Sequence, residues 1–338
     1  MELIRARAYA RAGLIGNPSD GYHGRTLSLI VRNYWAEAVL YEWEDLEIIL
    51  SQEDRCRFGS MAELQQDVQL HGYYGGVRLV KATIRRFGDY CQQNGISIHD
   101  RNFSIRYQSN IPRAVGMAGS SGIIIATLRA LMQFYKVEIP LEVQPSLALS
   151  VETGELRING GLQDRVAQVY EGLVYMDFAE EQTQILDGME AGHYEPLDPA
   201  LLPNIYMAFS HEAGEPTEIT HAPLRARYDD GDEKIHAAMK RFATISDEAK
   251  AALLAGDHQR FHQLVDENFD LRQSICDLSP SHVRMIEAAR AAGASAKFAG
   301  SGGAIVGTFT DQSQYEKLEQ NLTALGCEVF RPQITPTT

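Results

Sequence analysis

Two glycine-rich stretches carry the strongest chemical signal in this sequence. The first, Gly116 to Ser121, reads Gly-Met-Ala-Gly-Ser-Ser and leads into an apolar stretch with helical spacing. A helix N-terminus offers free N–H groups and a positive dipole end, and glycine lets an anion approach the backbone closely. The pattern therefore favours a phosphate site, although it is not a Walker A motif, because G-x-x-x-x-G-K is absent. The alternative is that the serines only cap a core helix.

The second glycine-rich stretch runs from Gly300 to Gly303 as Gly-Ser-Gly-Gly and leads into a β-branched run. It does not match the dinucleotide fingerprint, because Ile305 stands where the third glycine belongs. Alone, such a stretch is typical of a tight connection between two elements. Two of them in one acidic chain favour a nucleotide as the ligand.

Length and composition bound the class of protein. The chain has 338 residues, of which 44% are hydrophobic, which suits two packed domains better than one core. Its formal net charge of -14 disfavours nucleic acid as a partner. The four cysteines are far apart and form no C-x-x-C pair, so neither a zinc site nor a disulfide framework is indicated. The charged N-terminus and the short apolar runs predict a cytoplasmic protein that does not engage a membrane.

Hydrophobic periodicity predicts a mixture of strands and helices in both halves. In the first half it predicts strands over 3–16, 103–107 and 172–178, two strands within 26–50, and helices within 61–93, after residue 122 and over 141–156. In the second half it predicts strands over 205–209, after 303 and from 328, and helices within 230–293 and over 313–325. The polar stretch 179–200 marks the boundary, giving domains 1–190 and 200–335 of α+β or α/β class.

Three ordered motifs resemble those of the GHMP kinase superfamily. They are the stretches Arg11 to Asp20, Pro112 to Ser121 and Phe298 to Gly303. Further stretches, above all Gly161-Leu-Gln-Asp-Arg-Val-Ala-Gln-Val-Tyr170, resemble the glucuronokinases within that superfamily. The resemblance implies an N-terminal α+β ATP-binding domain, a ferredoxin-like C-terminal domain and an active site in the cleft between them.

The resemblance also implies roles for particular residues. Asp164 would accept or orient the proton of the attacking hydroxyl, and Arg11 would stabilise charge in the transition state. Ser121 and Glu152 would hold Mg²⁺, with Glu155 as the rival carboxylate. The ATP phosphates would lie against Pro112, Gly116, Met117, Ala118, Gly119, Ser120, Ser121, Gly300, Ser301, Gly302 and Gly303.

The implied reaction is ATP-dependent phosphorylation of a uronate such as glucuronate at its 1-hydroxyl. Asn17 and Asp20 would bind the substrate, or would only shape a turn. Arginine suits a carboxylate, so Arg165 is expected to read that of the substrate. The other candidates are Arg25, Arg78 and Arg113, and each of the four has a structural ion pair as its alternative. Trp35, Tyr73 and Tyr74 would stack on adenine or sugar, although packing is the favoured reading for all three.

Two other readings remain open at this stage. Another kinase of the superfamily would act on a neutral sugar, a heptose phosphate or a mevalonate-type alcohol. A regulator would bind nucleotide and sugar without catalysis, but the presence of Asp164, Arg11 and the metal candidates disfavours it. In any of these roles the chain is expected to be a monomer or a homodimer.

Overall fold

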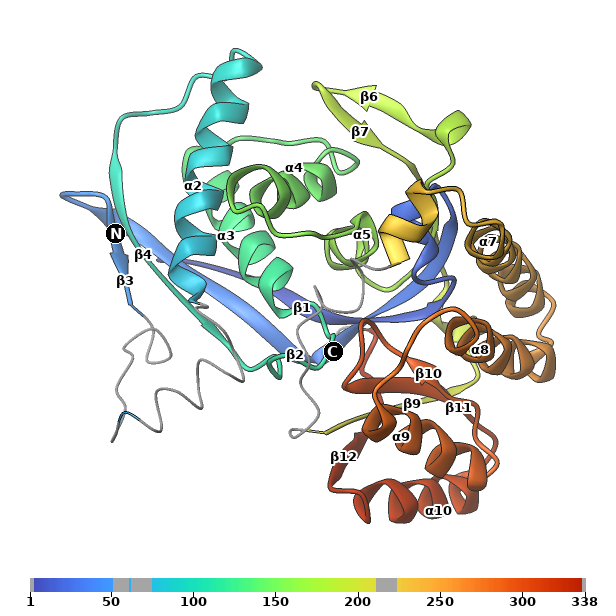
Figure 1. Ribbon diagram of the computed structural model, residues 1–338. Coiled ribbons are helices and arrows are strands. Elements are labelled where there is room, and N and C mark those ends of the chain that lie inside the picture. Colours follow the sequence, from blue (N-terminus) through green and yellow to red (C-terminus); the bar gives the residue numbers. More distant parts are fainter. Residues whose placement is uncertain (1–2, 51–60, 62–74, 211–223, 336–338) are drawn as a thin grey trace.

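The structure is a computed structural model that describes residues 3–50, 61, 75–210 and 224–335. Strands in the described part form a six-stranded sheet, a four-stranded sheet and a small two-stranded one. Helices cover one face of the large sheet, and the smaller sheet with its own helices lies beneath it (Figure 1). The predicted two-domain α+β fold is therefore confirmed.

Two long strands build the centre of the large sheet. β1 (Leu3–Ile15) pairs antiparallel with β2 (Arg25–Trp43) over most of its length. The first half of β1 alternates between exposed and buried residues, as its Arg/Ala alternation demands, whereas the second half is buried on both faces. That second half carries Arg11, so the first motif enters the interior of the molecule.

The remaining strands of the large sheet flank β2. Its order is β3-β4-β2-β5-β8, with β1 also on β2. These strands are β3 (Glu47–Ile49), β4 (Asn102–Ser109), β5 (Leu173–Asp177) and β8 (His193–Leu197). The two strands predicted within 26–50 are thus one long strand and one short one. β2 stays extended because strands pair with it on either side of a short gap at residues 32–34.

Helices cover one face of this sheet (Figure 1). They are α2 (Gly76–Gln93), α3 (Gly119–Tyr135), α4 (Gln144–Ser150) and α5 (Leu162–Tyr170). The apolar helix α3 packs against β1 and β2. The helix predicted within 61–93 begins, in the described part, at Gly76, and residues 62–74 lie outside the described chain. The helix predicted over 141–156 ends in a π-helical turn, Val151–Glu155, which carries Glu152.

The second sheet has the order β10-β11-β9-β12. Its strands are β9 (Asn204–Ser210), β10 (Lys297–Phe298), β11 (Ala304–Phe309) and β12 (Cys327–Phe330). The helices of this half are α7 (Glu233–Leu254), α8 (His258–Gln273), α9 (Pro280–Ala291) and α10 (Gln312–Thr323). α8 contacts both β1 and β10, so it bridges the two halves where the first and third motifs meet.

The domain limits of 190 and 200 stay a prediction. β8 falls between the predicted limits of 190 and 200, and it pairs with β5 in the large sheet. A hairpin of β6 (Gln184–Leu186) and β7 (Met189–Ala191) precedes it. Among the described helices, none is long and apolar enough to cross a bilayer.

Candidate active site

The first glycine-rich stretch has the backbone geometry of an anion site. Ala114, Gly116 and Ala118 all have positive φ, at 56°, 73° and 64°, and α3 starts directly afterwards at Gly119. Alternation of left-handed residues turns successive N–H groups to one side, which is the arrangement that cradles anions. An alanine in this region costs about 1 kcal/mol or more. Ala118 is thus a strained N-cap residue, and no side-chain hydrogen bond caps this end of α3.

The second glycine-rich stretch lies directly against the first. A Cβ atom on Gly300 would lie 2.2 Å from the Gly116 carbonyl oxygen, and one on Gly303 would lie 2.8 Å from the Val115 Cα. These two positions need glycine because backbone meets backbone, and not because of a phosphate alone. The two loops, 184 residues apart at Gly116 and Gly300 (300 − 116), therefore form one surface.

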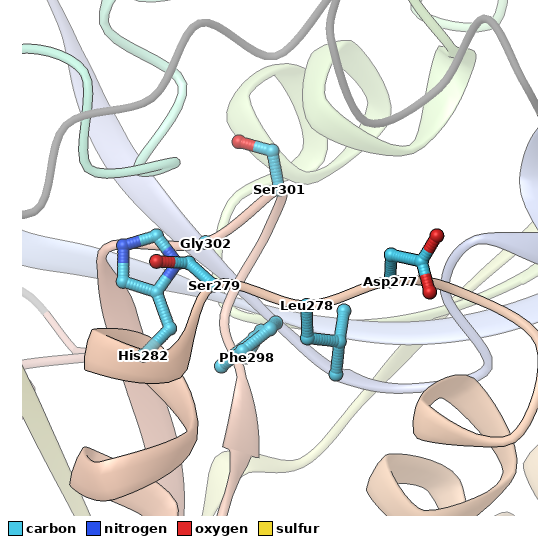
Figure 2. A pocket seen from close by; sticks show the side chains of 7 residues that line it. All are labelled: Asp277, Leu278, Ser279, His282, Phe298, Ser301 and Gly302. Carbon is cyan, nitrogen blue, oxygen red and sulfur yellow. The ribbon is translucent and has the colours of Figure 1, made fainter.

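The far side of the second loop borders a small pocket (Figure 2). Its lining comprises Asp277, Leu278, Ser279, His282, Phe298, Ser301 and Gly302. The His282 ring lies beside Gly302, where an added Cβ would be 2.8 Å from Nδ1. The Ser301 side chain points away from Phe298 in this view. A Cβ on Gly116 would lie 3.1 Å from Ser301 Oγ, so the second loop borders the pocket on one side and the first loop on the other.

Arg11 connects all three motifs. Its side chain is almost buried, and both Nε and Nη2 lie 2.6 Å from Asp164 Oδ1. Nη1 donates to the Gly116 carbonyl at 2.6 Å and to the Ala299 carbonyl at 3.0 Å. One guanidinium thus fixes the position of Asp164 relative to both loops. The planar, five-donor geometry of arginine suits this role, and lysine could not reproduce it.

Two carboxylates face each other beside Arg11. Asp164 lies in the first turn of α5, where the helix dipole favours a negative charge, and its side chain is 25% exposed. Asp20 lies so close to the start of α5 that a Cβ on Gly161 would be 2.2 Å from its Oδ2. Burial, and then the negative charge of Asp164, raise the pKa of Asp20 to about 6. The negative charge of Asp164 therefore disfavours ionisation of Asp20.

A second arginine–carboxylate pair lies on the other side of Asp164. Glu152 is buried and forms an ion pair with Arg165, which is also buried. Arg165 Nη1 donates to the Gly161 carbonyl at 2.7 Å and lies 3.7 Å from Asp164 Oδ2. Arg165 is therefore already surrounded by carboxylates.

The predicted metal ligands are arranged differently from the expectation. Ser120 Oγ donates to Glu152 Oε1 at 2.8 Å, whereas the buried Ser121 turns its hydroxyl to the Ala118 carbonyl at 3.3 Å. The rival, Glu155, pairs with Arg85 at 3.3 Å. The structure thus brings Glu152 to the phosphate loop, with Ser120 as its hydroxyl neighbour.

Other predicted residues have clear surroundings. Arg25 pairs with Asp177 and Asp247, and Arg113 is exposed on the first loop. The Arg7 guanidinium stacks over the ring of Trp35, with Cζ 4.5 Å from the ring centroid. Tyr73 and Tyr74 lie outside the described residues.

Two buried cations were missed by sequence reasoning. Lys297 Nζ donates to the Gly13 carbonyl and to Asn17 Oδ1, both at 2.6 Å, so it connects the C-terminal half to the first motif. Arg272 donates to the carbonyls of Gly300 and Ser301 at 2.7 and 3.1 Å. Lys297 directly precedes the third motif, which was a usable signal. Arg272 lies in the helical part of the sequence with no motif around it.

Comparison with known proteins agrees with this geometry. The family descriptions "GHMP kinases N terminal domain" and "GHMP kinases C terminal" match residues 78–172 and 249–326. The chain belongs to the GHMP kinase family, whose members use ATP with a divalent metal.

Individual relatives span nearly the whole chain. Glucuronokinase 1 of Arabidopsis thaliana is 41% identical over 99% of this chain and 93% of its own length. Probable glucuronokinase 2 of the same plant is 42% identical over 98% of this chain and 91% of its length. The crystal structure of Lactococcus lactis galactokinase with galactose superposes with a TM-score of 0.74 at 16% identity, covering 98% of this chain and 94% of that one. The last likeness shows the fold alone.

Proposed function

We propose that this protein is an ATP-dependent sugar-acid kinase that phosphorylates glucuronate, or a related uronate, on its 1-hydroxyl. The observation that carries the phosphotransfer is the fourfold contact of Arg11 with Asp164, Gly116 and Ala299. It joins a carboxylate to both phosphate-facing loops in a single rigid unit. The choice of a uronate is supported by the full-length similarity to the glucuronokinases.

In the proposed phosphoryl transfer, Asp164, whose side chain is 25% exposed, accepts a proton from the sugar. The sugar O1–H proton passes to Asp164 as O1 forms a bond to the γ-phosphorus of ATP. The bond from that phosphorus to the β,γ-bridging oxygen breaks, and ADP leaves with the electron pair. The contact with Arg11 orients Asp164 before the reaction. Loop amides from Gly116 to Ser121 would hold the phosphates at the start of α3.

Magnesium fits the donor atoms on this side of the site. Ser120 and Glu152 supply a hydroxyl and a carboxylate within 2.8 Å of each other, and Mg²⁺ prefers such oxygen ligands together with substrate phosphates. Bound there, Mg²⁺ would neutralise charge on the phosphates. Arg165 shares the Glu152 carboxylate and would weaken, but not abolish, its attraction for a cation. Ser121 would contribute only after rotating its hydroxyl away from Ala118.

The test is a substrate panel with product analysis. ATP consumption is measured with glucuronate, galacturonate, glucose and galactose under one set of conditions, and the position of the phosphate is read by NMR. A uronate used best, with phosphate on C1, is the expected result. A neutral hexose used as well as either acid would contradict the uronate assignment and leave a GHMP kinase of another specificity.

A further inference from the structure

Three buried cations gather where the first and third motifs meet. The exposed fractions of Arg11, Lys297 and Arg272 are 5%, 1% and 3%. Arg11 has Asp164 as its counter-ion, but in the described chain neither Lys297 nor Arg272 has an ion pair with a carboxylate. Burial, and then the charges of Arg272 and Arg11, hold the pKa of Lys297 well below its usual range. Buried charges are normally paired, so this cluster lacks negative charge.

The two unpaired cations point to different parts of the site. Arg272 donates to the carbonyls of Gly300 and Ser301, so its charge lies under the phosphate-facing loop. Lys297 reaches the other way, to the carbonyl of Gly13 and to Asn17 Oδ1. Arg272 therefore holds the second glycine-rich loop, whereas Lys297 contacts the first motif.

The bond from Lys297 fixes which end of the Asn17 amide is available. Lys297 Nζ also donates to the Phe298 carbonyl at 2.7 Å, and three acceptors match the three hydrogens of an ammonium. An ammonium only donates, so the Asn17 atom it contacts is the amide oxygen, and the NH₂ end faces elsewhere. Among the described residues, Asn17 Nδ2 has no hydrogen-bond acceptor, although the side chain is nearly buried. Asn17 therefore presents donors alone, backed by a positive charge. A carboxylate, which only accepts, complements such a group.

Asn17 also lies near Gln163, the residue that precedes Asp164. A Cβ on Gly13 would lie 3.4 Å from Asn17 Cγ and 2.4 Å from Gln163 Nε2, and Gln163 precedes Asp164. Asp20, three residues further along the same turn, faces the start of α5. The charges of Asp164 and Arg11 act on Asp20, so the turn that carries Asn17 borders the carboxylate of Asp164. Arg165 is less suited to a substrate carboxylate because Glu152 already neutralises it.

We propose that Asn17, oriented by Lys297, receives the carboxylate of the sugar-acid substrate, and that Lys297 supplies its counter-charge. This inference rests on the proposed function. Asn17 is then a specificity-determining residue, and Lys297 is the positioning residue behind it. The proposal predicts that an acidic side chain at position 17 would form an ion pair with Lys297 and repel the carboxylate of the substrate.

The experiment compares two substitutions at one position. Asn17→Asp adds a charge of nearly the same shape, whereas Asn17→Leu removes the donors without adding charge. For glucuronate, Asn17→Asp should raise KM about tenfold or more, because like charges in contact are strongly unfavourable, and Asn17→Leu should raise it less. KM for ATP should change little in both. Asn204→Asp is the matched control, since Asn204 is exposed and pairs with Phe309 at the end of β11 remote from Gly303.

The outcomes separate this inference from the proposed function. An active wild type with an equal rise of KM for glucuronate in both Asn17 variants, or an equal rise of KM for ATP, overturns the inference alone. So does a large rise of KM in Arg165→Lys with Asn17→Asp unchanged, which would return the carboxylate to Arg165. A wild type that phosphorylates no uronate overturns the proposed function and this inference together.

Discussion

Two arginine–carboxylate pairs lie side by side in this protein and differ in exposure. In the open pair, Arg11 and Asp164, the side chains are 6% and 25% exposed. In the closed pair, Arg165 and Glu152, they are 5% and 2% exposed. Each arginine is buried, so the difference lies entirely in the acid. An acid held by a buried arginine but open to solvent can meet a substrate, whereas a fully buried one acts mainly through its neighbours.

The elements that carry the two acids explain the contrast. Asp164 lies in the first turn of α5, at the edge of the helix layer. Glu152 lies in the π-helical turn after α4, which turns its side chain inward to Ser120 on the phosphate loop. The closed pair therefore holds both neighbours in place: Glu152 contacts Ser120 on the first glycine-rich loop, and Arg165 lies beside Asp164 of the open pair.

The largest expected effect follows from breaking the closed pair. Arg165→Met leaves Glu152 buried without a counter-ion, so the free energy of unfolding should fall by about 3–5 kcal/mol. Arg101→Met is the control, because Arg101 and Glu42 are about half exposed, and its loss should cost less than about 1 kcal/mol. Denaturant titration measures both. Equal, small changes would show that the closed pair does not stabilise the fold as argued. The double variant Arg165→Met/Glu152→Leu should recover much of the loss.

Breaking the open pair should lower turnover above all, and it should also lower stability, because buried Arg11 loses its counter-ion. Asp164→Asn keeps the shape of the side chain but cannot accept the proton, so kcat should fall by roughly 10²-fold or more. ATP binding, measured by calorimetry, should remain. Asp270→Asn makes the same change in an exposed ion pair with Arg290 and should leave kcat unaltered. Near-wild-type turnover in a folded Asp164→Asn protein would remove Asp164 from the reaction.

The two serines sharpen the role of the closed pair in metal use. Ser120→Ala removes the hydroxyl that contacts Glu152, and the Mg²⁺ concentration for half-maximal activity should rise about tenfold, the scale of a hydrogen bond to a charged group. Ser121→Ala should change it less, because that hydroxyl contacts a backbone carbonyl. Glu152→Gln should behave like Ser120→Ala. If instead Ser121→Ala or Glu155→Gln has the larger effect, the metal ligands differ from those inferred here.

The smallest effect concerns Asp20, the carboxylate beside the open pair, and its pH dependence. Asp20 has a pKa of about 6, so kcat/KM for the sugar should be about half lost at pH 6 and fall further in more acid solution. Asp20→Asn should lack this acid limb. Because folding raises the pKa above 3.8, the carboxyl contributes less stability as pH rises through 6. Asp20→Asn should therefore unfold at higher denaturant than wild type at pH 8. A variant less stable at that pH would contradict the inferred desolvation of Asp20.

Much of the fold followed from local sequence signals. The strand predicted over 3–16 is β1, and the helix predicted over 313–325 is α10, because both have clear periodicity and turn residues at their ends. The two strands predicted within 26–50 are confirmed as β2 and β3, but the 19-residue length of β2 has no local signal, because it depends on the strands that pair with it on both sides. The π-helical turn at Glu152 likewise has no local signature.

The sequence by itself determined the three motifs and their order, which are properties of residue type and spacing along the chain. The resemblance that these motifs carry implied Asp164 and Arg11 as the reacting groups proposed here. Only the tertiary structure decided which charges neutralise one another: Arg165 with Glu152, Arg11 with Asp164, and Lys297 with the Asn17 amide instead of a carboxylate. The physical reason is that electrostatic partners are chosen by distance and burial after folding, and Lys297 and Asn17 lie 280 residues apart in the sequence.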